Sequence, residues 1–445
     1  MARPSGRSRK RHWRGEVGAQ DGTPAEPIRL QIDTLGRRGD GVARHGGRAV
    51  YVAQTLPGEE LTVRLGEADG DGVRAEAIEL IEASPQRVEP PCPHFGPCGG
   101  CSVQHVSDPL YAEWKLGIVR TALDRAGFAG TPMLPIARSA PGTRRRAAFR
   151  ALRGERSVFL GFSERASHRI VDVTDCRVVV PSMMPLLTAL RALLGDMLAV
   201  RQSAVAEVTA TDGGIDMLLE VEAEATLPLR ERAAAFASEQ GLARLTVRWG
   251  DMQEDPIVAA RPATVTFDGI PVPVPPGTFL QATRSGEDAL RGFVLGALSS
   301  GSRPGRIVDL FAGCGSFALP LARLAPVLAV EGDEAALEAL AMAARAAGLP
   351  VRTELRDLAK RPLRADELAA SDVVVFDPPR LGAKAQAEQI ADSPVRQVFG
   401  ISCNPSTFAR DAAVLGAAGF ALESVLPVDQ FLWSAHVELA GRFRR

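Results

Sequence analysis

The chain has 445 residues, more than one hydrophobic core usually supports, so we expect two or three domains. An apolar content of 46%, a charged content of 24% and a net charge of -1 are ordinary for a water-soluble protein and carry no overall nucleic-acid signature. Six cysteines in a chain of this length exclude a disulfide framework and predict reduced thiols in the cytoplasm. The only long apolar run, Leu310 to Val330, contains glycines, a proline and Arg323, so we expect no membrane span.

Residues 1–24 are predicted to form a disordered tail. The stretch from Arg3 to Arg14 is rich in basic side chains and contains no acidic one. Such a block suits contact with phosphates, although a purely solubilising tail has the same composition.

Short alternating segments characterise residues 25–86. Ile28–Ile32 and Arg48–Val52 are two of them, and glycine-rich turns such as Gly36–Gly41 separate them. Short strands at regular spacing predict a small antiparallel β-barrel of the OB-like kind. Such barrels often bind single-stranded nucleic acid in a basic groove, and a purely structural β-module is the alternative.

Residues 87–276 have the pattern of a mixed α+β domain. We expect a helix over 109–126, a basic strand over 144–150 and a strand over 215–221. The proline-rich stretch Pro271–Pro276 is typical of a hinge or an extended connector to the last domain.

Strand and helix patterns alternate over residues 277–445. The predicted strands are 307–310, 327–330, 373–376, 397–401 and 422–428, and the predicted helices are 317–324 and 334–347. This alternation predicts an α/β fold with a doubly wound, mainly parallel, Rossmann-like sheet. Ligands of such sheets bind at the carboxyl ends of the strands.

A cofactor loop follows the first of these strands. Gly313 and Gly315 let the chain turn sharply there, and the next strand ends in Glu331, whose carboxylate would accept both ribose hydroxyls. A third glycine and a P-loop lysine are both missing, which favours a cofactor without a pyrophosphate, namely S-adenosylmethionine. Asp357 is a candidate adenine contact, or an exposed loop acid.

Three reactive side chains lie on the same predicted edge. Cys403 follows a strand and precedes a helix start, whose dipole we expect to stabilise a thiolate; a buried structural cysteine is the alternative. Asp377 opens an Asp-Pro-Pro-Arg turn that could hydrogen-bond a nucleobase or the cofactor. Glu438, on a strand predicted over 435–439, is a candidate base, or else a surface carboxylate.

A thiol beside a methyl donor suits alkylation of an unactivated pyrimidine carbon. Attack of a thiolate on C6 of uracil turns C5 into an enolate carbon that can accept a methyl group. A general base then removes the C5 proton so that the thiol can leave. Cys403 and Glu438 are the residues to which we assign these two roles.

The motifs Ser-Cys-Asn-Pro around Cys403, Asp-Pro-Pro-Arg from Asp377 and His-Val-Glu ending at Glu438 resemble those of the RNA 5-methyluridine methyltransferases. Residues 25–86 resemble the RNA-binding TRAM module that precedes them. The resemblance implies that Cys403 is the nucleophile and Glu438 the base. The family's cofactor and target-base positions fall on Gln281, Phe311, Glu331 and Asp377. Thr283, Ser316 and Leu432 depart from residues that the family often has.

Cys92, Cys98 and Cys101 form a C-x5-C-x2-C motif, and Cys176 follows. Four thiolates hold either tetrahedral zinc or an iron–sulfur cluster, and the remote fourth ligand favours the cluster. The ribosomal-RNA branch of the family typically carries a [4Fe–4S] cluster in this arrangement, and its transfer-RNA branch generally lacks one. Methyl transfer needs no redox step, so we expect a structural or RNA-orienting role.

We therefore expect a monomeric three-domain enzyme that methylates C5 of a uridine in RNA, with 23S ribosomal RNA favoured. A transfer-RNA methyluridine enzyme and an RNA 5-methylcytosine enzyme are alternatives. The cytosine enzymes typically carry a second cysteine in the Asp-Pro-Pro turn, which this chain lacks. A non-catalytic RNA-binding assembly factor is a further alternative, against which Cys403, Asp377 and Glu438 argue.

Overall fold

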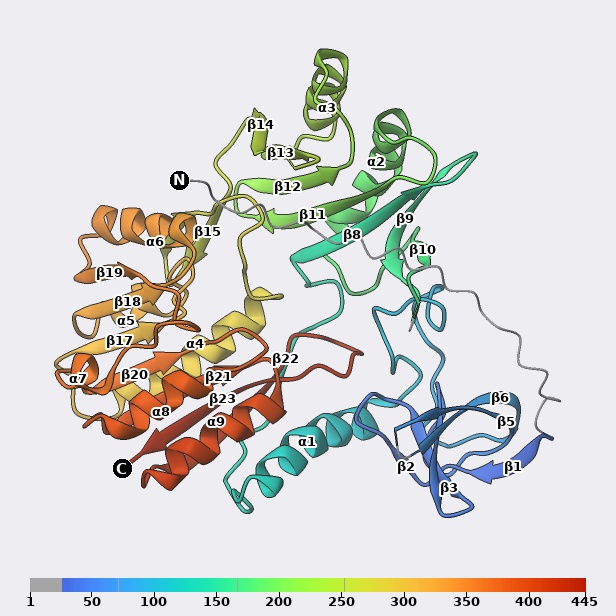
Figure 1. Ribbon diagram of the computed structural model, residues 1–445, viewed down its shortest axis with the longest axis horizontal. Helices are drawn as coiled ribbons and strands as arrows, with labels where there is room; N and C mark the ends of the chain where they lie inside the picture. Colours follow the sequence, from blue (N-terminus) through green and yellow to red (C-terminus); the bar gives the residue numbers. More distant parts are fainter. Residues whose placement is uncertain (1–25, 71, 166, 252) are drawn as a thin grey trace, which may run out of the picture. The chain divides into compact units, whose positions relative to one another are not determined.

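The computed structural model describes residues 26–70, 72–165, 167–251 and 253–445 (Figure 1). The described residues divide into two compact units: residues 26–34 with Gly41–Ser84, and Leu35–Asp40 with Pro85–Arg445. The predicted basic tail lies outside the described residues. Within the described ranges, no helix is both long and apolar enough to cross a membrane.

The N-terminal strands form one six-stranded sheet. They are β1 Ile28–Gln31, β2 Thr34–Leu35, β3 Gly41–His45, β4 Arg48–Val52, β5 Glu60–Asp69 and β6 Gly72–Glu82, in the order β1-β5-β6-β4-β3-β2. Alternate side chains such as Leu30, Val50 and Leu61 are buried in its core, as the period of a half-buried strand requires. The predicted strands are confirmed, but β4 and β6 pair in parallel, so the expected wholly antiparallel arrangement is wrong at that pair.

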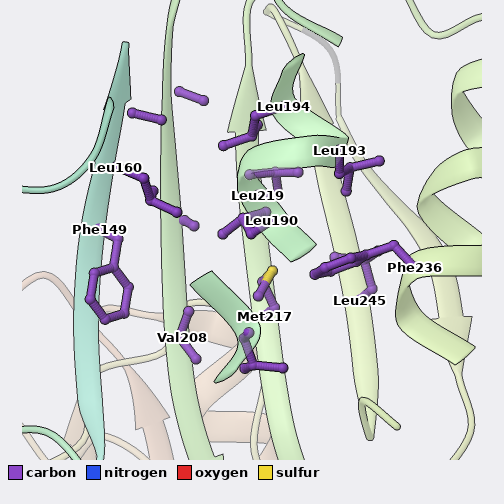
Figure 2. Close-up of a cluster of buried hydrophobic side chains, with 14 of the residues drawn as sticks. Phe149, Leu160, Leu190, Leu193, Leu194, Val208, Met217, Leu219, Phe236 and Leu245 are labelled. Carbon is purple, nitrogen blue, oxygen red and sulfur yellow. The ribbon is translucent and has the colours of Figure 1, made fainter. Parts of the chain in front are cut away.

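The middle of the chain builds a seven-stranded sheet in the order β10-β9-β8-β11-β12-β13-β14. Its strands are β8 Arg146–Arg153, β9 Val158–Ser163, β10 Ile170–Asp172, β11 Ser203–Thr211, β12 Gly214–Val221, β13 Arg244–Trp249 and β14 Glu254–Ala259. The helices α2 Met184–Met197 and α3 Leu227–Glu239 cover it. Figure 2 shows Leu190 and Leu194 of α2 and Phe236 of α3 facing Leu160, Leu219 and Leu245 of the sheet.

The first part of the proline-rich stretch lies in an ordered strand, which agrees with an extended connector and not with a hinge. β15 Thr264–Phe267 and β16 Ile270–Pro273 form an antiparallel pair. Ile270 and Val272 are buried while the alternating Pro271 and Pro273 are exposed. Proline has no N–H to donate, and a two-stranded ribbon leaves such positions unpaired, so the prolines are tolerated there.

The C-terminal region forms an eight-stranded sheet in the order β19-β18-β17-β20-β21-β23-β22-β7. Its strands are β7 Ala137–Arg138, β17 Ile307–Leu310, β18 Val327–Glu331, β19 Val351–Leu355, β20 Val373–Phe376, β21 Gln397–Ser402, β22 Ala421–Asp429 and β23 Glu438–Arg444. Strands β17 to β21 are parallel, and β23 is antiparallel to both neighbours. The doubly wound sheet is confirmed, and its order reverses between β17 and β20, where such sheets bind ligands.

The same part of the chain forms six helices: α4 Arg284–Ser299, α5 Ala318–Leu321, α6 Glu334–Ala346, α7 Ala365–Leu368, α8 Lys384–Asp392 and α9 Pro405–Ala417. Helix α5 is shorter than predicted. After Pro320 the chain tightens into three-residue turns, with Arg323 N–H bonded to the Pro320 carbonyl and Leu324 N–H to the Leu321 carbonyl. The last predicted strand, 435–439, is displaced toward the C-terminus: β23 begins only at Glu438 and continues to Arg444.

Two elements that precede the seven-stranded sheet in the sequence lie against this C-terminal sheet. β7 pairs in parallel with the end of β22, where Ala137 faces Val428. Helix α1 Asp108–Arg125, close to the predicted 109–126, runs alongside α9 and β22 (Figure 1). Residues far apart in sequence therefore meet where β22 ends.

Leu190 tests the core drawn in Figure 2. Leu190→Ala should lower the free energy of unfolding by about 2–5 kcal/mol, because it empties a fully buried position. Urea denaturation should show the loss. Leu227→Ala is the matched control, because Leu227 is 68% exposed and its loss should change stability by less than about 0.5 kcal/mol. Equal effects of both substitutions would contradict this packing.

Candidate active site

The loop after β17 is built from unusual backbone conformations. Phe311 has φ 61°, Gly313 has φ 52° and Gly315 has φ 94°. A Cβ at Gly315 would lie 2.8 Å from Cγ of Leu340, so both the φ angle and the packing require glycine there. A bulky residue such as Phe311 rarely adopts a positive φ, and strain of this kind concentrates at ligand sites.

Glu331 holds this loop from the end of β18. Its carboxylate accepts hydrogen bonds from the backbone N–H of Gly313 at 2.9 Å, Gly332 at 2.6 Å and Asp333 at 3.0 Å. The predicted cofactor residues Gly313 and Glu331 are therefore brought together. Apart from Gly313 and its two chain neighbours, no residue has an atom within 4 Å of the Cβ position of Gly313, which leaves this side of the loop open to a ligand.

Asp357 lies at the rim of this site. Its Cα is 3.6 Å from the Cβ position of Gly332. Its carboxylate, however, accepts from Ala359 N–H at 3.1 Å and pairs with Nζ of Lys360 at 2.7 Å. Lys360 lowers the pKa of this exposed carboxyl. In this structure Asp357 thus caps a surface turn.

A row of side-chain hydrogen bonds joins the other predicted residues. Nε2 of Gln281 donates to Oδ2 of Asp377 at 3.0 Å. Nε2 of Gln430 donates both to Oε1 of Gln281, at 2.6 Å, and to Oε2 of Glu438. Sequence reasoning missed Gln430, although a polar residue two positions after the strand predicted to end at Val428 was a usable signal.

Cys403 lies between β21 and α9, at the same edge of the sheet. The side chain of Asn404 caps α9 by accepting from Ser406 N–H at 3.1 Å. The half-buried thiol of Cys403 interacts electrostatically with both Glu438 and Asp377. The predicted nucleophile, base and acidic turn therefore share one site.

This site disfavours negative charge. Burial raises the pKa of Cys403 to about 11; Glu438 and Asp377 add to the increase, and Arg380 opposes it. The expected thiolate stabilisation by the helix is therefore outweighed. Burial also raises the pKa of Asp377 to about 7 against its bond from Gln281, and burial followed by Asp377 raises the pKa of Glu438 well above its usual range.

The segment that carries Gln281 is anchored by a buried ion pair. Nε of Arg145 donates to the Gln281 carbonyl at 3.1 Å, and its Nη2 lies 2.8 Å from Oε1 of Glu287. Thr283 caps α4 through the N–H of Gly286 at 3.0 Å. Burial raises the pKa of Glu287 while Arg145 opposes the increase. Arg145 belongs to the predicted basic strand, but its role was not foreseen.

The four remaining predicted cysteines line one cavity of about 240 Å³; they are Cys92, Cys98, Cys101 and Cys176. Burial raises the pKa of the Cys98 and Cys176 thiols, and that of Cys101 to about 12. In the part of the chain that the structure describes, no three His, Cys, Asp or Glu side chains are arranged closely enough to hold a metal ion. The sixth cysteine, Cys314, is buried in the cofactor loop with its Sγ 3.6 Å from Oγ1 of Thr278.

Known proteins resemble the chain over nearly its whole length. Residues 25–78 match the TRAM domain. An RNA methyltransferase of Rhizobium meliloti is 45% identical, with 94% of this chain and 99% of the relative covered. The 23S rRNA (uracil(1939)-C(5))-methyltransferase RlmD of Halomonas elongata is 36% identical, with 92% and 88% covered.

One solved structure shares the fold over nearly the whole chain. It is the tRNA (uracil-54, C5)-methyltransferase of Pyrococcus abyssi in complex with S-adenosyl-L-homocysteine. The TM-score is 0.71 at 20% identity, with 93% of this chain and 99% of that chain covered. The sequence relatives show that the chain belongs to the family of S-adenosylmethionine-dependent RNA (uracil-5-)-methyltransferases, and the shared fold and the site geometry agree with this.

Proposed function

We propose that the enzyme methylates C5 of a uridine in ribosomal RNA through a covalent bond between Sγ of Cys403 and C6 of uracil. The observation that carries this proposal is the convergence of Cys403, Asp377 and Glu438 at one site. A ribosomal target is favoured by the Halomonas elongata relative, whose name specifies 23S rRNA. The four cysteines around one cavity also favour the ribosomal branch.

Each part of the chain has its own role in the proposed function. Residues 1–24 contact phosphates and residues 25–86 hold RNA, the role expected of a TRAM module. Residues 87–276 carry the cysteine cavity. Residues 277–445 bind S-adenosylmethionine at Phe311, Gly313, Gly315 and Glu331 and perform the chemistry.

Each reacting group has one task in this mechanism. The Cys403 thiol loses its proton to solvent and the resulting thiolate adds to C6, and the electron pair of the C5–C6 double bond moves onto the C4 carbonyl as an enolate. When bound, S-adenosylmethionine would supply the methyl group and leave as S-adenosyl-L-homocysteine. C5 takes that methyl group, and Glu438 then accepts the C5 proton. The electrons of the broken C–H bond restore the double bond and expel the Cys403 thiolate.

The two reacting residues are separable by substitution. Cys403→Ala should abolish both methyl transfer and any covalent RNA–protein species, because C5 is never activated. Glu438→Gln should still add and methylate but fail to remove the C5 proton, so turnover should fall about 10²–10⁴-fold. Denaturing gel electrophoresis should then show a methylated RNA–enzyme adduct. Wild-type turnover by Glu438→Gln without adduct would disprove the role of Glu438.

The pH dependence of Cys403 alkylation tests the electrostatics of the site. Only the thiolate reacts, so labelling by iodoacetamide in the RNA-free enzyme should rise with pH toward a midpoint of about 11. Asp377→Asn removes one neighbouring negative charge, so the midpoint should move to lower pH. Mass spectrometry of the Cys403 peptide measures this. A midpoint below that of a free cysteine in the unsubstituted enzyme would contradict the raised pKa.

We also propose that Cys92, Cys98, Cys101 and Cys176 hold a [4Fe–4S] cluster, on the grounds that they line one cavity. Protein purified without oxygen should be brown, with about four iron and four sulfide per chain. Cys176→Ser should lower the iron content, whereas Cys314→Ser, outside the cavity, should not. Stoichiometric zinc without visible absorption would show that the tetrahedral alternative is correct.

A further inference from the structure

The loop between β22 and β23 carries the residues that set the position of the proposed base. Gln430 follows the last residue of β22, and Glu438 is the first residue of β23. Trp433, in the middle of the loop, has φ 58°. A large side chain adopts that conformation only where surrounding contacts enforce it. The loop therefore needs an external support.

Lys115 of helix α1 supplies that support at both ends of the loop. Its side chain is fully buried. Its Nζ donates to Oδ1 of Asp429 at 2.8 Å and to the carbonyl of Phe431 at 3.4 Å, both at the start of the loop. It also donates to the carbonyl of His436 at the far end. A lysine ammonium has three protons, and all three are used.

Tyr111, one turn earlier in α1, holds the middle of the same loop. Its hydroxyl donates to Oδ2 of Asp429 at 2.6 Å and accepts from Trp433 N–H at 2.9 Å. The Trp433 carbonyl in turn accepts from the N–H of Ser102 at 2.8 Å and of Val103 at 3.1 Å. The loop is thus shaped on a template outside the C-terminal sheet.

We propose that Lys115 is a positioning residue for proton removal: by closing both ends of this loop, it holds Gln430 and Glu438 in the geometry that the C5 proton requires. The inference rests on Glu438 being the base of the proposed function. A misplacement of about 1 Å in a catalytic group can cost about 10²-fold in rate. Nucleophilic addition by Cys403 uses a different loop, after β21, and should be spared.

A double substitution tests this without leaving a lone buried charge. Removing one partner of a buried pair strands the other, so Lys115→Met is combined with Asp429→Asn. The methylated RNA–enzyme adduct should accumulate and kcat fall about 10²-fold, with KM for RNA within about twofold. The control is Arg244→Met with Asp216→Asn, a 2.7 Å pair in the central sheet, which should form no excess adduct. A fall in kcat without adduct in the Lys115 variant would overturn the proposal.

A milder variant keeps the test possible if the double variant does not fold. Tyr111→Phe deletes one hydroxyl and keeps the ring, and it should also accumulate adduct. The chain has two tyrosines, so Tyr51→Phe is its matched control and should behave as wild type. Wild-type resolution of the adduct by folded Tyr111→Phe would also overturn the proposal. If Glu438→Gln traps adduct while the loop variants do not, only this inference fails; if Glu438→Gln traps none, the base assignment fails.

Discussion

Two carboxylates, Asp377 and Glu438, lie at the ends of a row formed by the amides of Gln281 and Gln430, and the rest of the site depends on that row. Carboxylates that share a poorly solvated site repel each other when both are ionised. Amide N–H donors at both ends favour the ionised forms. A glutamine can donate to a carboxylate in this way only when its amide is held in one orientation, so the backbone around Gln281 and Gln430 must be fixed.

The anchors are two buried ion pairs that reach across the sequence. Arg145 and Glu287 fix the segment of Gln281, and Lys115 and Asp429 fix the loop of Gln430. Buried pairs add little net stability, because removing two charges from water offsets their attraction. Their value here is geometric. The C-terminal sheet carries the candidate reacting groups, and Arg145 and Lys115, from earlier in the chain, hold the segments beside them.

Sequence patterns predicted the features that depend on neighbouring residues in the chain, such as strands and the residues at their ends. Cys403, Asp377 and Glu331 were found because they follow apolar strands, and parallel strands bring their carboxyl ends to one edge. Lys115 could not be found, because a lysine in a helix of mixed composition has the same pattern whether solvent or a distant loop faces it. Its burial arises from contacts with residues more than three hundred positions away.

The same reasoning explains the other differences. The start of β23 at Glu438 is set by the loop's bonds to α1, since polar and apolar residues also alternate just before it. The expected low pKa of Cys403 considered only the dipole of helix α9. Burial and two carboxylates from other strands act on the same sulfur and outweigh that dipole.

The protonated state of Cys403 has a consequence for the lifetime of the enzyme. Peroxides attack thiolates and leave thiols largely untouched, so a cysteine with a pKa of about 11 resists conversion to sulfenic and sulfinic acids at neutral pH. In the RNA-free enzyme, burial keeps the sulfur in this protonated form, and Glu438 and Asp377 add to the effect. Resistance of this sulfur to oxidation in the free enzyme therefore follows from its burial.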